Sequence, residues 1–233
     1  SVIHCAWNGV QSCARNDNIQ KNNLKLSLDT VKLASILNCV SWTGLGSHSE
    51  YGQMKKKVSE NDKCNPTTFY GKVKLKTGKS CLKACEESKI IGRWIRIFDT
   101  YGPKDNKSWL IPYIIDRLKE NKSPSLTKCD QIWDFLHIED AVNAIVKLHL
   151  SNSTGIYNLG SEYPRPLKEY ISIIYENFSD KKKPSFGNKP YRRDQVMCLH
   201  PDISKISNQI QWKPKISFKN GIKELIKYEK IQL

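Results

Sequence analysis

The chain has 233 residues, 39% hydrophobic and 26% charged, a composition typical of a soluble globular protein with one sizeable core or one domain with a small lobe. No apolar run approaches the roughly 18 residues of a membrane span, and the opening lacks the pattern of a secretory leader, so we expect a cytoplasmic protein without a membrane partner. The net charge of +15 suggests a nucleic-acid partner, but 31 lysines against 7 arginines, spread without a dense arm, favour a solvated surface or a basic cleft for a phosphorylated small molecule.

The first hundred residues alternate strands with helices. Apolar runs predict strands over residues 2–6 and 39–43, joined by a helix over 17–37. A second helix is predicted over 66–87, with a proline near its first turn, and a strand over 90–98 ends at the turn TYGP. Strands that alternate with crossover-length helices predict a parallel sheet covered on both faces.

The later part of the chain is more irregular and more helical. The elements expected there are a helix at 109–120, a strand at 134–138, a helix at 139–150, a strand at 155–160, a short strand at 195–199, and helices near 167–178, 202–209 and 217–230. The irregular part should pack over the carboxyl ends of the strands, where open α/β sheets bind ligands.

Two residues on the predicted helix 66–87 are candidates for chemistry. Tyr70 and Lys74 are four residues apart and therefore share one helical face. Chance alone gives about one Tyr-x-x-x-Lys in a chain of this composition, and the second copy, Tyr51 with Lys55, lies in a glycine-containing turn. We interpret the second copy as coincidence, because its partners need not face the same way.

Ser47 supplies the context that the Tyr70 pair needs. It lies in the glycine-rich stretch TGLGSHSEYG, residues 43–52, which we expect to be a turn at the carboxyl end of a strand. A free tyrosine has a pKa near 10, and a neighbouring ammonium together with a positively charged nicotinamide would lower that value. Ser47, Tyr70 and Lys74 are therefore predicted to move a proton at an alcohol or ketone oxygen while a hydride is transferred.

Six motifs in one order resemble a known family. The stretches VIHCAW, GSHSEYG, YGKVK, RIFDTYGP, WDFLHIEDAVNAI and GIYNLGS are similar, in sequence and in order, to those of the extended short-chain dehydrogenase/reductases that act on nucleotide sugars. The resemblance implies an α/β fold, a Rossmann-like doubly wound parallel sheet with a smaller C-terminal substrate-binding lobe. Residues 1–98, with 134–160 returning to them, would form the C-terminal part of the dinucleotide-binding domain, and 99–133 with 161–233 the lobe.

The resemblance also implies ligands and a partner. The cofactor would be NAD or NADP, bound through Ala6, Tyr70 and Lys74, and the substrate a nucleotide sugar. A homodimer is implied as well, formed by the helices at 17–37 and 66–88. Its candidate interface or core positions are Leu24, Leu28, Val31, Leu75 and Leu82.

Further residues are expected at the substrate because they match family positions. For Asn23 the alternatives are an active-site role and helix-surface polarity, and for His48 a substrate contact and an ordinary loop side chain. Asp99 replaces the family's usual asparagine and Trp133 a frequent arginine, at positions that commonly touch the nucleotide. Arg193, with Arg192 as its rival, resembles a phosphate-contacting arginine.

Two departures from the family pattern limit the function. No Gly-x-x-Gly-x-x-Gly turn occurs in the chain, so we expect it to be truncated at its N-terminus and to bind a dinucleotide poorly by itself. Dehydratases of the family carry an Asp-Glu pair after the serine, where this chain has His48 and Ser49. The sequence therefore favours an NAD(P)-dependent 4-epimerase or 4-keto reductase over a dehydratase.

Other readings of the chain are weaker. A non-catalytic remnant that has lost cofactor binding fits the missing glycine turn, and a basic nucleic-acid-binding module fits only the charge. The eight cysteines include no Cys-x-x-Cys and the five histidines are scattered, which predicts reduced thiols and no metal site. We expect no nucleic-acid partner.

Overall fold

The computed structural model describes residues 1–11, 14–178, 183–192 and 195–231. Its centre is a parallel four-stranded sheet in the order β1-β2-β3-β7, in which β2 and β3 pair along their whole length. The four strands are β1 (Val2–His4), β2 (Ser41–Ser47), β3 (Ile91–Ile97) and β7 (Gly155–Leu159). The predicted parallel sheet is confirmed.

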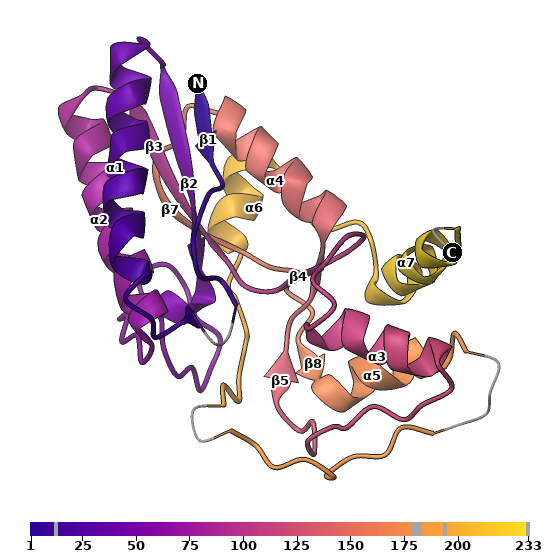
Figure 1. The fold of residues 1–233 in the computed structure, drawn as a ribbon. Helices are drawn as coiled ribbons and strands as arrows, with labels where there is room; N and C mark the ends of the chain where they lie inside the picture. The colour runs from indigo at the N-terminus through magenta and orange to yellow at the C-terminus, as the bar shows by residue number, and fades with distance from the viewer. Residues whose placement is uncertain (12–13, 179–182, 193–194, 232–233) are drawn as a thin grey trace.

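Helices cover both faces of this sheet (Figure 1). On one side α1 (Gln20–Ile36) packs against α2 (Phe69–Glu87), and on the other α4 (Ile138–Leu150) packs with α6 (Ser204–Ile210). A helical layer on each face is what lets the parallel strands be buried on both sides. The doubly covered α/β architecture expected from the sequence is therefore present.

The stretch expected to be a turn after residue 43 is instead strand. β2 continues to Ser47, and its two glycines, Gly44 and Gly46, lie under the stacked indole rings of Trp42 and Trp94. A Cβ on Gly44 would lie 2.7 Å from one Trp94 ring atom, and a Cβ on Gly46 2.4 Å from another. These glycines mark the close approach of large rings to a strand, rather than a change of chain direction.

A second hydrophobic core lies in a lobe beyond the carboxyl ends of the strands (Figure 1). It is built mainly by α3 (Leu110–Lys119), α5 (Leu167–Tyr175) and α7 (Phe218–Ile231). Short strand pairs join this core to the sheet: β4 (Thr100–Tyr101) with β6 (Leu136–His137), and β5 (Ile132–Trp133) with β8 (Arg165–Pro166). The lobe thus lies beyond the carboxyl ends of the strands, and its role in substrate binding stays a prediction.

Parts of the later chain differ from the expected elements. The strand predicted at 195–199 is reduced to one bridge, between Ile132 and Cys198, and the strand predicted at 134–138 to two residues. Ile203, Ile206 and Trp212 fall in the range assigned to the lobe but pack in the core between the sheet and α4. Their apolar side chains are buried by β7 and α4, which no local pattern indicates.

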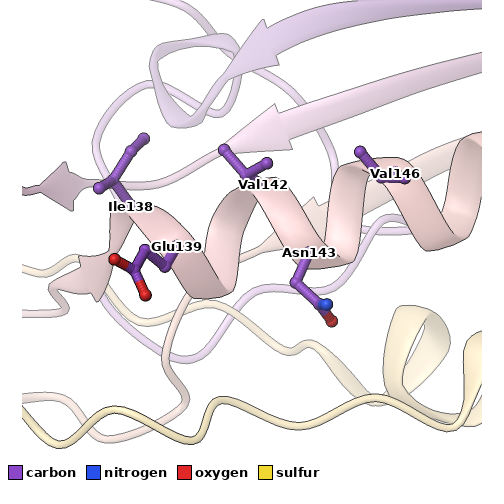
Figure 2. A pocket seen from close by; sticks show the side chains of 5 residues that line it. All are labelled: Ile138, Glu139, Val142, Asn143 and Val146. Atoms are coloured by element: carbon purple, nitrogen blue, oxygen red, sulfur yellow. The ribbon is translucent and has the colours of Figure 1, made fainter.

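One face of α4 presents a row of exposed apolar side chains. They are Ile138, Val142, Val146 and Leu150. The first three line a shallow hollow together with Glu139 and Asn143 (Figure 2). α4 contacts β2, the neighbour of β1, and β1 is an edge strand of the sheet. Among the described residues, no helix combines the length and apolar composition that a membrane crossing requires.

Candidate active site

The three predicted catalytic side chains converge at one end of the sheet. Ser47 is the last residue of β2, and Tyr70 and Lys74 lie one turn apart near the start of α2. The Ser47 hydroxyl is close enough to the Tyr70 phenol to lower its pKa. All three residues are buried, with exposed fractions of 8%, 6% and 5%. The start of α2 is fixed by Thr68, whose hydroxyl accepts a hydrogen bond from the backbone of Gly71 at 3.1 Å.

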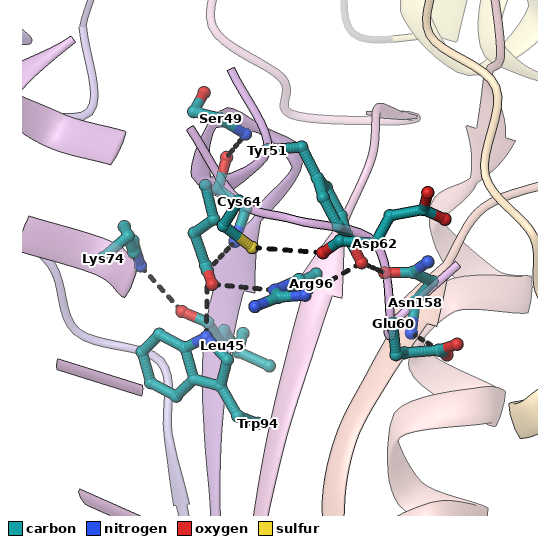
Figure 3. A network of polar contacts seen from close by, with 12 residues as sticks. Leu45, Ser49, Tyr51, Glu60, Asp62, Cys64, Lys74, Trp94, Arg96 and Asn158 are labelled. Carbon is teal, nitrogen blue, oxygen red and sulfur yellow. Dashed lines mark hydrogen bonds and ion pairs between the residues drawn. The ribbon is translucent and has the colours of Figure 1, made fainter. Parts of the chain in front are cut away.

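The Lys74 ammonium is enclosed by protein. Its Nζ donates to the Leu45 carbonyl at 2.7 Å and lies 3.5 Å from the centroid of a Trp7 ring (Figure 3 shows the first contact). Burial lowers the pKa of Lys74 to about 7, although the negative charge of Glu50 opposes the shift. Lys74 is therefore only partly charged at neutral pH.

Several features of its surroundings act on the pKa of the Tyr70 phenol in the protein by itself. Burial raises its pKa, while the Ser47 hydroxyl and the charge of Arg15 lower it, and burial is the larger effect. The Arg15 guanidinium lies 5.3 Å from the Tyr70 ring centroid and Lys74 Nζ lies 5.7 Å from it. In the protein alone the phenol is thus held in its neutral form at neutral pH.

Asn23 organises the loop between β1 and α1. Its amide accepts from the Asn8 backbone N–H at 2.9 Å and donates to the Asn8 carbonyl at 3.0 Å, and the side chain is almost fully buried. Gln20 donates to the carbonyls of Gly9 and Ala14 in the same loop and accepts from the Trp7 indole. Asn23 is therefore not surface polarity: it holds the loop that carries Trp7.

A buried polar network holds the backbone of Ser47 in place. The Glu50 carboxylate accepts from the Ser47 backbone and the Trp94 indole, both at 2.9 Å, and from Arg96 Nε at 2.8 Å. Arg96 also donates to the Tyr51 hydroxyl at 2.9 Å (Figure 3). The second Tyr-x-x-x-Lys copy therefore contributes its tyrosine to a structural network.

Three of the predicted substrate residues besides Asn23 lie in the described part of the chain, and one does not. Asp99 and Trp133 meet, because the indole Nε1 donates to Asp99 Oδ2 at 2.7 Å, and burial raises the pKa of Asp99 to about 7. His48 stacks at an angle on Phe98, and burial lowers its pKa to about 3, so the imidazole stays neutral. Arg193 lies outside the described residues.

Several residues near Tyr70 were not found from the sequence. Ala6, predicted at the cofactor, is exposed in the loop after β1, but its neighbour Trp7 makes the contact with Lys74. Arg15 belongs to no motif that we recognised, and Glu50 lies in the motif GSHSEYG but was given no role. The only available clue was that a tryptophan and an arginine occur in the polar stretch that follows a strand. Among the described residues, no three His, Cys, Asp or Glu side chains gather closely enough to hold a metal ion.

Comparisons with known proteins point to one family. A model described as the NAD dependent epimerase/dehydratase family matches residues 1–160. CDP-abequose synthase of Salmonella typhimurium is 32% identical over 143 residues, which cover 57% of this chain and 46% of that protein. UDP-glucuronic acid decarboxylase 1 of Arabidopsis thaliana is 27% identical over 137 residues, covering 58% of this chain and 31% of that protein. The matched part of the chain spans less than half the length of these relatives.

Solved structures share the fold over nearly the whole chain. The UDP-N-acetylglucosamine 4-epimerase from Methanobrevibacter ruminantium, in complex with UDP-N-acetylmuramic acid, superposes with a TM-score of 0.91 at 18% identity, covering 99% of this chain and 76% of that one. The UDP-glucuronic acid 4-epimerase from Bacillus cereus, in complex with UDP-glucuronic acid and NAD, gives 0.83 at 21% identity, covering 93% and 70%. With a family model that matches more than half of its residues, this chain belongs to the NAD-dependent epimerase/dehydratase family.

Proposed function

We propose that the chain carries the catalytic residues of an NAD(P)-dependent nucleotide-sugar 4-epimerase or 4-keto reductase. The observation that carries the proposal is the convergence of three buried side chains at the carboxyl end of β2: Ser47 is the last residue of the strand, and Tyr70 and Lys74 lie one helical turn apart near the start of α2. The family supports it, as do relatives named CDP-abequose synthase and UDP-N-acetylglucosamine 4-epimerase.

The residues near Lys74 fit one end of a nicotinamide dinucleotide. A lysine ammonium has three N–H donors, of which one is directed at the Leu45 carbonyl, so others serve for ribose hydroxyls. Ala6 is exposed and small, in the loop whose Trp7 contacts Lys74. The 233 residues include no Gly-x-x-Gly-x-x-Gly turn for the pyrophosphate, so they supply only the nicotinamide end.

The chemistry proposed for this chain is proton transfer at the C4 oxygen of the sugar. A bound NAD(P) would supply or accept the hydride at C4. Ser47 donates a hydrogen bond to the C4 carbonyl oxygen and orients it. During reduction Tyr70 gives its phenolic proton to that oxygen as the C–H bond forms, and during oxidation of the alcohol it accepts the proton. The charge of Lys74 stabilises the phenolate left on Tyr70.

Loss of water from the sugar lacks a suitable acid/base pair. Desolvation lowers the pKa of His48, the residue after Ser47, to about 3, so its imidazole stays neutral. Glu50 is the nearest carboxylate along the chain, but it is buried and bound to Arg96. We therefore propose that the enzyme acts at C4 and does not form a 4-keto-6-deoxy sugar from a 6-hydroxy nucleotide hexose.

A second set of residues is proposed to bind the substrate. Asp99 and Trp133, joined at 2.7 Å, are proposed to contact the nucleotide or sugar, with His48 beside them. Arg193 is proposed for the phosphates. Asn23 is proposed to act through the loop it holds. The homodimer through α1 and α2 stays a prediction, which sedimentation would test.

The test uses the protein expressed from its complete reading frame. It is incubated with NADH or NADPH and a 4-keto-6-deoxy nucleotide sugar, and oxidation of the cofactor is followed. In a second reaction a nucleotide hexose is examined for its C4 epimer by NMR. Turnover in one of the two supports the proposal. Absence of both, with a cofactor that binds, would refute it. Absence of cofactor binding would instead favour the non-catalytic remnant, which the missing glycine turn suggests.

A further inference from the structure

Two cations, not one, lie against the ring of Tyr70. The Arg15 guanidinium carbon is 5.3 Å from the ring centroid and Lys74 Nζ is 5.7 Å from it. Both distances are within the roughly 6 Å at which a cation interacts appreciably with an aromatic ring. Lys74 comes from the same helix as Tyr70, whereas Arg15 comes from the loop before α1.

The backbone couples Arg15 to the start of α2. The Tyr70 N–H donates to the Arg15 carbonyl at 2.8 Å, and the neighbouring Phe69 N–H donates to the Asn16 side chain at 3.0 Å. These bonds occupy two N–H groups that the first turn of a helix leaves unpaired. On the other side of Arg15, the Gln20 amide donates to the Ala14 carbonyl at 3.0 Å. The position of Arg15 relative to Tyr70 is thus fixed through main-chain contacts that need no arginine side chain.

The two cations differ in how permanent their charge is. Lys74 is enclosed by the Leu45 carbonyl and the Trp7 ring, and its pKa of about 7 leaves it partly neutral at physiological pH. A guanidinium stays protonated throughout that range. The other groups that face Tyr70 are the Ser47 hydroxyl, the edge of the Trp7 ring and the negative Glu50 of η2 (His48–Glu50).

We propose that Arg15 is a positioning residue that supplies the permanent positive charge beside Tyr70 and stabilises its phenolate during catalysis. The inference rests on the proposed function for its catalytic meaning, but its physical content concerns this chain alone. Removing the charge destabilises the phenolate, while replacing arginine by lysine retains the charge. The negative charge of Glu50 acts on Tyr70 in the opposite sense.

The experiment is a titration of Tyr70 in the chain without cofactor. The ultraviolet absorbance of phenolate is followed with pH for the parent, for Arg15→Gln, Arg15→Met and Arg15→Lys, and for each with Tyr70→Phe added. The difference between each pair isolates Tyr70. We expect the titration midpoint to move to higher pH in the Gln and Met variants and to return toward the parent value in Arg15→Lys. An unchanged midpoint in a folded Gln or Met variant, as judged by circular dichroism, overturns the proposal.

A second measurement uses the protein from its complete reading frame. Arg15→Gln should lower kcat at neutral pH about tenfold, the effect of raising the pKa of the neighbouring phenol by about one unit, and the loss should shrink as the pH rises. A loss that is the same at every pH indicates a structural role and counts against the proposal. If the parent protein has no activity, the proposed function fails, while the titration still decides the role of Arg15.

Discussion

Arg96 Nε donates to Glu50 Oε2 at 2.8 Å, and the two side chains are only 2% and 1% exposed. This buried ion pair contacts the candidate active site, because Glu50 also accepts a hydrogen bond from the Ser47 backbone N–H. A buried charge is tolerated only while its partner is present. The pair therefore couples the stability of the sheet to the position of Ser47, the proposed catalytic serine.

Replacing Glu50 by glutamine should destabilise the protein strongly. The amide retains the size of the side chain but leaves the Arg96 guanidinium buried without its counter-charge. Breaking one member of a buried pair typically costs about 3–5 kcal/mol, which denaturant unfolding would measure. The matched control is Glu87→Gln, which removes an exposed partner of Lys83 at 3.8 Å and should change stability by less than about 1 kcal/mol. Equal effects of the two substitutions would contradict the prediction.

Substitutions in the two Tyr-x-x-x-Lys copies should have different effects, one on the catalytic rate and the other on stability. Tyr70→Phe removes the proposed proton donor and should lower kcat by roughly 10²–10⁴, with cofactor affinity retained. Tyr51→Phe removes a hydroxyl that donates to Asn158 at 2.7 Å and accepts from Arg96. It should cost about 1–3 kcal/mol of stability and leave kcat within a few-fold of the parent. Steady-state kinetics and unfolding of both variants provide the comparison, and a reversed pattern would refute the assignment.

The stability of the protein should rise with pH because of Lys74. Burial lowers its pKa from the ordinary value of 10.5 to about 7 in the folded chain. Between these values the unfolded chain binds more protons than the folded one, so the free energy of unfolding increases with pH. The contribution approaches about 1.4 kcal/mol per pH unit. Lys74→Met removes the titrating group, so its stability between pH 7 and pH 10 should rise less steeply. Parallel curves for parent and variant would exclude the shift.

Asp99 should make the stability of the protein fall as the pH rises. Burial raises its pKa from 3.8 to about 7, so the folded chain holds a proton that the unfolded chain has released between those values. Its contribution to stability is fully present below the lower value and is lost as the pH rises through 7. Asp99→Asn keeps an acceptor for the Trp133 indole and does not ionise. Thermal unfolding should therefore place this variant above the parent at pH 8 and close to it at pH 4. The same ranking at both pH values would argue against an ionising Asp99.

The sheet was predictable from the sequence because each strand is a local apolar run. The length of β2 was not predictable, because its two glycines are typical of a turn. Only the structure shows that the rings of Trp42 and Trp94 occupy the space beside them. Local patterns describe the chain near one residue. Here the deciding neighbour lies on the adjacent strand β3, some fifty residues further along the chain.

The candidate active site was also only partly predictable from the sequence. Ser47, Tyr70 and Lys74 were predicted from spacing and order, and the structure brings them together. Arg15 was missed because its contact with Tyr70 joins a loop before α1 to the first turn of α2, and no periodicity records such a contact. The effect of burial on the pKa of Tyr70 in the protein alone was not predicted, since the degree of burial follows only from the packed structure.

The exposed row on α4 and the net charge act against each other in solution. Four apolar side chains along one helix face attract other apolar surfaces, while a formal charge of +15 keeps copies of the chain apart. Salt shortens the range of that repulsion, to about 8 Å at physiological ionic strength, and leaves the apolar attraction intact. The colloidal stability of this chain therefore depends on dilute buffer: it should remain dispersed at low salt and precipitate progressively as salt is added, the reverse of ordinary salting-in.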